Sequence, residues 1–200
     1  MSATGALELA RRAALEGGRV IREAGLATGE VEEKGAGDYV TRIDREAEDA
    51  IMAVLLGEDP DSHVLGEERG GARSGRYWLV DPLDGTTNFV HGLPILGVSV
   101  ALVEGGIPTV GVVHAPLLDT TFTAERGAGA EQDGRPLHVS SRKPSDAVVA
   151  TGFPFRHKER LPEYQRVFLP ALEAFEDLRR AGLNMEEEGG PAADGFVYNY

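Results

Sequence analysis

The chain has 200 residues, no cysteine and a formal net charge of −13. A chain of this size can bury the core of one large domain or two small ones. The negative charge argues against a nucleic-acid or anionic-membrane partner, because such partners are bound mainly by Lys and Arg. The lack of cysteine excludes disulfides, zinc–thiolate sites and thiol nucleophiles.

The first segment, MSATGALELARRAALEGG, lacks the uninterrupted apolar core of a signal peptide. The longest apolar run, ILGVSVALV, is far shorter than the roughly 20 residues that a membrane helix needs. We therefore expect a cytoplasmic protein.

Apolar residues recur at steps of three and four between Ala6 and Ala24. This spacing predicts a helix with one buried face. Gly17 and Gly18 each weaken a helix by about 1 kcal/mol relative to Ala. We therefore expect another element to pack closely against that turn.

A second helix is predicted after a Gly-rich loop that leads into Thr41. Thr41 can cap this helix, and Asp44 then occupies position N3, where its carboxylate can complete a capping box. The helix should end near Gly57.

From His63 the hydrophobic period changes to that of short strands broken by Gly, Asp and Pro. These runs predict antiparallel strands and hairpins. They are HVLGEE, RYWLVD, ILGVSVALVEGGIPTVGVVHAP, TTFTAERG and RPLHVS. The clearest turns are Glu104-Gly105-Gly106 and Gln132-Asp133-Gly134.

The last third of the chain has a different layout. AVVATGFPF predicts a strand and a loop, PEYQRVFLPALEAFEDLRRAG predicts a helix, and the segment after it has no clear period. The fold class is therefore α+β / α/β. We expect an N-terminal α+β lobe at residues 1–140, with an antiparallel sheet and the functional site, and a partial C-terminal α/β lobe at residues 141–200.

The stretch WLVDPLDGTTNFVHGLP contains two aspartates, Asp81 and Asp84, at the end of an apolar strand. Pro82 fixes its own φ and biases Asp81 toward an extended conformation. Both carboxylates can then turn toward one point, and the Leu83 carbonyl is left free as a further oxygen ligand. Mg²⁺ prefers such oxygen ligands and uses only a few carboxylates.

The residues that follow, Gly85-Thr86-Thr87, are predicted to open a helix whose N–H groups bind a phosphate. Other acidic residues also stand at element ends, namely Asp44, Glu67 and Glu68. Taken alone, Asp44 is equally well explained by the helix dipole. Glu67 and Glu68 taken alone are typical of a solvated loop.

Four segments together resemble the inositol monophosphatase family of Mg²⁺-dependent, lithium-sensitive phosphatases. They are DYVTRID, GEE, the long WLVDPLDGTTNFVHGLP motif and ATGFPF, and the similarity extends from about Lys34 to about Gly182. The resemblance implies a layered αβαβα sandwich of the sugar-phosphatase type, commonly a homodimer.

The resemblance also implies roles for individual residues. The metal ligands would be Glu67, Asp81, the Leu83 carbonyl and Asp84. The catalytic residues would be Glu67, Asp81 and Thr86, with Glu67 and Thr86 orienting the attacking water. The substrate phosphate would bind at Asp84, Gly85 and Thr86. Lys34 and Asp44 would lie in or beside a mobile metal-site loop.

One family feature is missing from the sequence. A Trp-Asp pair that opens a later helix, and gives the second metal one more carboxylate, does not occur in this chain. We therefore expect an incomplete C-terminal lobe and a second Mg²⁺ site that is weaker than the first. A substitute carboxylate from Glu186–Glu188 or Asp194 is the alternative.

No Cys nucleophile and no recognisable Ser/His/Asp set exist in the chain. We therefore expect direct in-line transfer of the phosphoryl group to water by a Mg²⁺-dependent phosphomonoesterase. Its substrate would be a small phosphorylated polyol or sugar such as inositol 1-phosphate. The alternatives are a fructose-1,6-bisphosphatase, histidinol-phosphate or nucleotide phosphatase of the same family, and a non-catalytic relative that binds metal or a phosphosugar.

Overall fold

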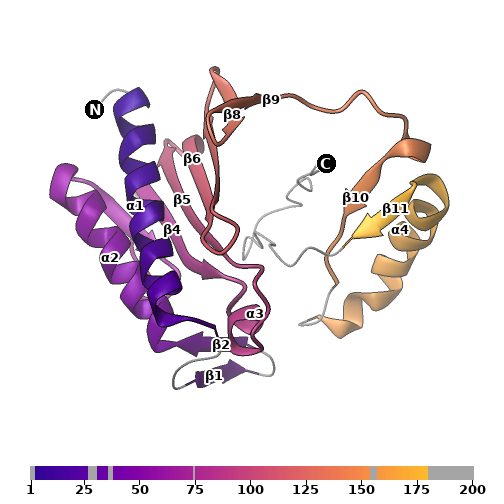
Figure 1. Ribbon diagram of the computed structural model, residues 1–200, viewed down its shortest axis with the longest axis horizontal. Coiled ribbons are helices and arrows are strands. Elements are labelled where there is room, and N and C mark those ends of the chain that lie inside the picture. Colours follow the sequence, from indigo (N-terminus) through magenta and orange to yellow (C-terminus); the bar gives the residue numbers. More distant parts are fainter. Residues whose placement is uncertain (1–2, 27–30, 36–37, 74, 154–156, 180–200) are drawn as a thin grey trace. The chain divides into compact units, whose positions relative to one another are not determined.

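The structure is a computed structural model that describes residues 3–26, 31–35, 38–73, 75–153 and 157–179, with the backbone alone for 31–35 and 38–40 (Figure 1). The described chain divides into two compact units, Met1–Leu137 and His138–Tyr200. Among the described helices, none is both long enough and apolar enough to cross a membrane.

A seven-stranded sheet forms the framework of the first unit. Its strands lie side by side in sequence order, from β3 to β9. They are β3 (His63–Gly66), β4 (Arg76–Asp84), β5 (Gly97–Glu104), β6 (Ile107–Ala115), β7 (Thr120–Glu125), β8 (Gly129–Gln132) and β9 (Arg135–Leu137). All neighbours from β4 to β9 pair antiparallel, as the sequence predicts.

Both predicted turns are confirmed as two-residue hairpin connections. Gly105 and Gly106 have φ values of 59° and 80°, and Asp133 and Gly134 have φ values of 50° and 76°. Positive φ at both central residues is typical of the type I′ turn, whose twist matches that of the strands it joins.

Two helices cover the sheet, α1 (Ala3–Ala24) and α2 (Arg42–Glu58). They pack on each other, α1 packs on β5 and β6, and α2 packs on β4. The close approach expected at the glycine pair is confirmed. A Cβ on Gly17 would lie 2.7 Å from Ile51 Cδ1, and one on Gly18 would lie 2.4 Å from His114 Cδ2.

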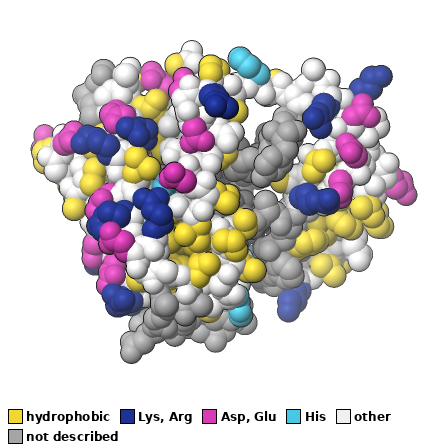
Figure 2. Space-filling model, in the orientation of Figure 1, with side chains coloured by type: hydrophobic (Ala, Val, Ile, Leu, Met, Phe, Trp, Pro, Cys, Tyr) yellow, Lys and Arg dark blue, Asp and Glu magenta, His cyan; other side chains and the backbone are white. Residues whose placement is uncertain are grey.

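The outer face of these helices carries charges of both signs, which Figure 2 shows interspersed over α1 and α2. They form ion pairs such as Arg12–Glu58 and Arg11–Glu8, with partly exposed side chains. Exposed pairs of this kind contribute little to stability. The buried stripe therefore contributes more than these exposed ion pairs to holding the helices on the sheet.

The segment before α2 differs in part from the sequence prediction of a Gly-rich loop. It forms two antiparallel strands, β1 (Val31–Gly35) and β2 (Asp38–Thr41), that lead into the helix. The predicted capping box at Thr41 and Asp44 is confirmed, and α2 ends at Glu58, next to the predicted Gly57.

The second unit contains a strand–helix–strand arrangement. Strand β10 (Val148–Ala150) pairs parallel with β11 (Asp177–Arg179), and α4 (Leu161–Ala174) connects them. Short 3-10 turns lie at Pro144–Asp146 and Lys158–Arg160. The predicted helix was too long, because residues 177–179 pair with β10 despite their helical pattern. Tertiary pairing overrides local propensity here.

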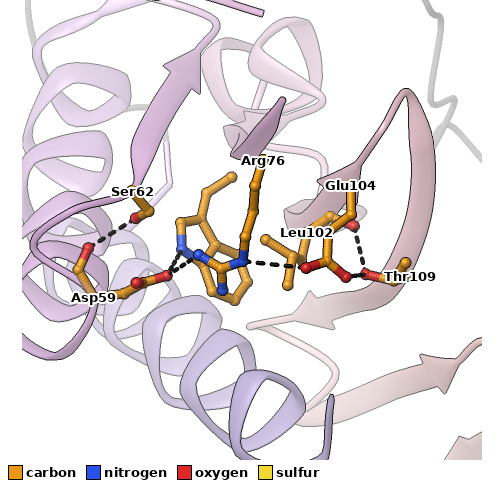
Figure 3. Close-up of polar contacts among 7 residues, drawn as sticks. Asp59, Ser62, Arg76, Leu102, Glu104 and Thr109 are labelled. Carbon is orange, nitrogen blue, oxygen red and sulfur yellow. Dashed lines mark hydrogen bonds and ion pairs between the residues drawn. The ribbon is translucent and has the colours of Figure 1, made fainter. Parts of the chain in front are cut away.

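The end of α2 and the start of β4 are joined by polar contacts around Asp59 (Figure 3). Asp59 Oδ2 accepts hydrogen bonds from Arg76 Nη1 at 2.6 Å and from the fully buried Trp78 Nε1 at 3.1 Å. Burial alone would raise the pKa of Asp59, but these two hydrogen bonds and the Arg76 charge lower it. Arg76 Nε also donates to Glu104 Oε1 on β5 at 3.2 Å. Helix α2 is thus fixed to the first residues of β4.

His114 is a buried histidine on β6, and it packs against Gly18 of α1. Its Nε2 lies 3.2 Å from Arg22 Nη1, and its Nδ1 lies 3.0 Å from Thr121 Oγ1. Because a guanidinium only donates, Nε2 must accept, so the ring is neutral. Burial is the main cause that lowers the pKa of His114, and the Arg22 charge adds to it.

This lowered pKa predicts a pH-dependent stability. The unfolded chain binds a proton at His114 near the ordinary value of 6.5, whereas the folded chain resists it. The contribution is therefore fully present above that value and is lost progressively as pH falls below it, through the lower pKa of the folded state. We expect the free energy of unfolding in urea to fall less between pH 7.5 and 5.5 in His114→Gln than in the unchanged protein. His63→Gln, at an exposed site on β3, is the control. Equal falls in all three proteins would contradict this assignment.

Candidate active site

Strands β3 and β4 bring two predicted site residues to one edge of the sheet. The sequence predicted antiparallel strands, which is wrong for this pair, because β3 and β4 run parallel with Gly66 opposite Val80. The chain after Gly66 returns to the start of β3 before it enters β4. Glu67 and Asp81 are the residues directly after this pair, so they lie at the same end of neighbouring strands. The Glu67 N–H donates to Val80 O at 3.2 Å.

The pKa of Asp81 is affected by burial and by two other carboxylates at this end of the sheet. Burial is the main cause that raises its pKa well above the ordinary range, and the negative charges of Glu67 and Asp84 raise it further. A side-chain hydrogen bond with Glu67 acts in the same direction, whereas the Leu83 N–H, 3.1 Å from Asp81 Oδ1, acts against it. The three carboxylates predicted as metal ligands thus influence one another.

The segment between the two aspartates forms a bulge. Asp81 pairs with Ser99 and Asp84 pairs with Gly97, so two residues of β4 stand opposite one residue of β5. Pro82 lies in this bulge, where its missing N–H costs no ladder hydrogen bond. The bulge redirects the end of β4, and the motif residues Asp81 and Asp84 lie on either side of it.

Thr86 links the end of β4 to the start of α2. Its hydroxyl lies 2.9 Å from Asp44 Oδ1 and 3.1 Å from the Leu83 carbonyl oxygen, and it can donate to either. Leu83 as a whole is buried, and its carbonyl oxygen lies within hydrogen-bonding distance of the Thr86 hydroxyl. A single hydroxyl therefore contacts both the predicted carbonyl ligand and a carboxylate of the second helix.

Asp44 does more than cap its own helix. Its Oδ2 accepts from the Thr41 N–H at 2.7 Å and from the Thr41 hydroxyl at 2.5 Å, while Oδ1 accepts from Thr86. Burial raises the pKa of Asp44, and these hydrogen bonds oppose the rise. The sequence placed Asp44 at position N3, but no local signal marked its contact with Thr86. The resemblance already implied a place for Asp44 in or beside the metal-site loop, and the structure shows its contact with Thr86.

Gly85 is required by the backbone. It precedes α3 (Thr86–Val90) with a φ of 95°, a region that residues with a Cβ rarely adopt. A Cβ there would also lie 3.0 Å from the Ile95 carbonyl oxygen. The predicted helix start at Gly85-Thr86 is present, although the helix is short. Phosphate binding at Asp84, Gly85 and Thr86 stays a prediction.

The donor chemistry fits Mg²⁺, because the residues gathered here offer carboxylate and carbonyl oxygens, and a divalent cation would relieve the crowding of negative charge around Asp81. In the described parts of the chain, however, no three Asp, Glu or His side chains converge as metal binding requires. Glu67 and Asp81 instead share a hydrogen bond. The ligand roles of Glu67, Asp81, Leu83 and Asp84 therefore stay predictions.

The side chains of several other residues named from the sequence lie outside the described part of the structure. The backbone of Lys34 lies in β1, but its side chain is outside what the structure describes. Glu186–Glu188 and Asp194 also lie outside the described residues.

The chain is similar in sequence to a family of known proteins. The model of the inositol monophosphatase family matches residues 4–184. A fructose-1,6-bisphosphatase/inositol-1-monophosphatase of Aquifex aeolicus is 38% identical over 181 residues, which cover 88% of this chain and 69% of that protein. The Nus factor SuhB of Pseudomonas aeruginosa is 41% identical over 186 residues, with the same two coverages.

A solved structure shares the fold. The extragenic suppressor protein suhB of Bartonella henselae superposes with a TM-score of 0.81 at 38% identity, covering 88% of this chain and 69% of that one. The predicted α/β sandwich fold class is confirmed. By its matched residues, its relatives and its fold, this chain belongs to the inositol monophosphatase family.

Proposed function

We propose that this protein is a Mg²⁺-dependent phosphomonoesterase that hydrolyses a small phosphorylated polyol or sugar, such as inositol 1-phosphate, by direct in-line attack of water. The observation that carries the proposal is the effect of the Glu67 and Asp84 charges on the pKa of Asp81, beside the Thr86–Asp44 contact. Family membership supports a phosphatase. As in other family members, the working form would be a homodimer.

The side chains divide the work of binding and orientation. Glu67, Asp81, Asp84 and the Leu83 carbonyl would hold the metal. Bound Mg²⁺ would supply a Lewis acid that activates water and neutralises charge on the phosphoryl group. Asp84, Gly85 and Thr86 would hold the substrate phosphate on the same side.

Thr86 is suited to orient the attacking water. A hydroxyl has one hydrogen and two lone pairs. When the hydrogen points to Asp44 Oδ1, 2.9 Å away, the lone pairs can accept a hydrogen bond from water. Glu67, which is exposed, would accept a second hydrogen from the same water and act as the general base.

The names of the relatives define which substrates to compare. One is named for fructose 1,6-bisphosphate and inositol 1-phosphate, and another is named a Nus factor. Both phosphate esters, together with histidinol phosphate and a nucleoside monophosphate, therefore belong in the same assay. The net charge of −13 favours a small-molecule substrate over direct binding of nucleic acid.

The test is release of inorganic phosphate from each ester with and without a chelator. We expect hydrolysis of inositol 1-phosphate to stop with the chelator and to return with Mg²⁺, because the oxygen ligands hold a hard cation. The Mg²⁺ titration should reach high concentrations, so that a weakly bound ion is also detected. Absence of phosphate release from every ester at every Mg²⁺ concentration would overturn the proposal in favour of a non-catalytic relative.

A further inference from the structure

Helix α2 contains a second buried carboxylate that none of the predicted roles uses. Glu48 lies one helical turn after Asp44, and its side chain is fully buried. Residues four apart on a helix lie on the same face. Asp44 and Glu48 therefore point to the same side of α2, and Asp44 already contacts the site through Thr86.

The Glu48 carboxylate accepts hydrogen bonds from the loop that follows β3. The Glu68 N–H donates to Oε2 at 3.1 Å, and the Arg69 N–H donates to Oε1 at 3.2 Å. Both donors come directly after Glu67, the predicted metal ligand and general base. Two adjacent backbone groups of this loop are thus bound to one carboxylate of a helix that precedes it by about twenty residues.

The loop is shaped to admit this carboxylate. A Cβ on Gly66 would lie 1.8 Å from Glu48 Oε1 and 2.6 Å from its carboxyl carbon, so only glycine leaves the necessary space. Gly66 and Gly70 close the loop with two backbone hydrogen bonds of 3.1 and 3.0 Å. Glu48 fills the turn between them.

A buried carboxylate is costly unless charge-assisted hydrogen bonds compensate. Burial raises the pKa of Glu48, and the N–H groups of Arg69 and Glu68 oppose the rise. An apolar residue could fill the same position of a helix stripe at lower cost. An apolar residue could not, however, accept the two hydrogen bonds that Glu48 accepts from the N–H groups of the loop.

We propose that Glu48 is a positioning residue that holds the Gly66–Gly70 loop and thereby sets Glu67 beside Asp81. The effect on catalysis rests on the proposed phosphatase function, whereas the hydrogen bonds between the loop and Glu48 do not. Glu48 acts through the backbone of Glu68 and Arg69 and touches neither substrate nor reacting atoms.

The matched variants are Glu48→Gln and Asp49→Asn. Glu48→Gln keeps the side-chain shape, but one of the two carboxylate oxygens becomes an NH₂ group. This group is a donor, so it cannot accept a hydrogen bond from the backbone N–H that it faces. Asp49 is the next residue on α2 and forms an exposed ion pair with the Arg69 side chain of the same loop. Asp49→Asn therefore disturbs the same loop from outside, without touching the backbone hydrogen bonds.

Two measurements are made on each variant. In the metal-free protein, amide hydrogen exchange of residues 66–70 should become about tenfold faster in Glu48→Gln, because one buried hydrogen bond is lost. In the Mg²⁺-loaded protein, kcat should fall about tenfold to a hundredfold, with KM changed less than about twofold, since Glu67 is misplaced and the phosphate ligands are not. Asp49→Asn should change neither.

The outcomes separate the two proposals. Unchanged exchange in Glu48→Gln, or faster exchange with unchanged kcat, would overturn the positioning role. A wild-type preparation without turnover would defeat the proposed function, and exchange would still decide whether Glu48 holds the loop. If Glu48→Gln does not fold, the exchange rates of the Glu68 and Arg69 amides in the wild-type protein decide whether Glu48 holds the loop. Exchange as slow as in β4 supports hydrogen bonding of these amides to Glu48, and exchange at the rate of an exposed loop overturns it.

Discussion

Asp81→Asn is expected to lower the rate of phosphate release by about 10³-fold or more, because it removes the charge at the centre of the proposed metal site. The amide keeps the shape of the side chain, so the fold should persist. It also relieves the repulsion that Glu67 and Asp84 exert on Asp81. The melting temperature of the metal-free variant should therefore be equal to or higher than that of the unchanged protein.

The same experiment gives a second signature. Mg²⁺ should raise the melting temperature of the unchanged protein, because a ligand that binds only the folded state stabilises it. The rise should be smaller in Asp81→Asn. Asp119→Asn is a matched control, because it makes the same change at an exposed turn residue with a φ of 51°. A folded Asp81→Asn protein with near-normal turnover would refute the assignment of Asp81 as a metal ligand.

Thr86→Ala is expected to lower kcat by about 10²-fold and to change KM little, since the hydroxyl orients water, whereas the backbone N–H of Thr86, which Ala keeps, would hold the phosphate. Thr86→Ser keeps the hydroxyl that contacts Asp44 and should retain most of the activity. Thr87→Ala, at the exposed next residue of α3, is the control. If Thr86→Ala instead weakened substrate affinity at constant kcat, Thr86 would be a phosphate ligand only.

Much of the fold follows from local signals in the sequence. The stripe from Ala6 to Ala24 predicted α1, and the glycine pair within it predicted a close contact that Ile51 and His114 provide. Thr41 and Asp44 predicted the start of α2 by their capping chemistry. Each of these signals lies within a few residues of the structure that it specifies.

The failures concern pairings between distant segments. The HVLG strand has the same alternation whether its neighbour runs parallel or antiparallel, so its parallel pairing with β4 could not be read from it. Residues 177–179 continue a helical pattern, yet they pair with β10.

In the candidate site, too, the residues grouped by local sequence were predictable, whereas contacts between distant segments were not. Asp81, Leu83 and Asp84 lie within one motif whose proline and glycine restrict the backbone, so their grouping follows from the sequence. Glu48 stands in the charged run REAEDA, which is typical of a solvated helix face. Its burial depends on the Gly66 loop that packs against it, and no residue near Glu48 signals that contact.

Helix α2 contacts both ends of the strand that carries the two motif aspartates. Asp44 in its first turn reaches Thr86, just after β4, and Asp59 at its end binds Arg76 and Trp78 at the beginning of β4. One residue inserted into or deleted from α2 would rotate one end relative to the other by about 100°. Only one of the two connections could then survive. The number of residues in α2 is therefore as constrained as the identity of its carboxylates.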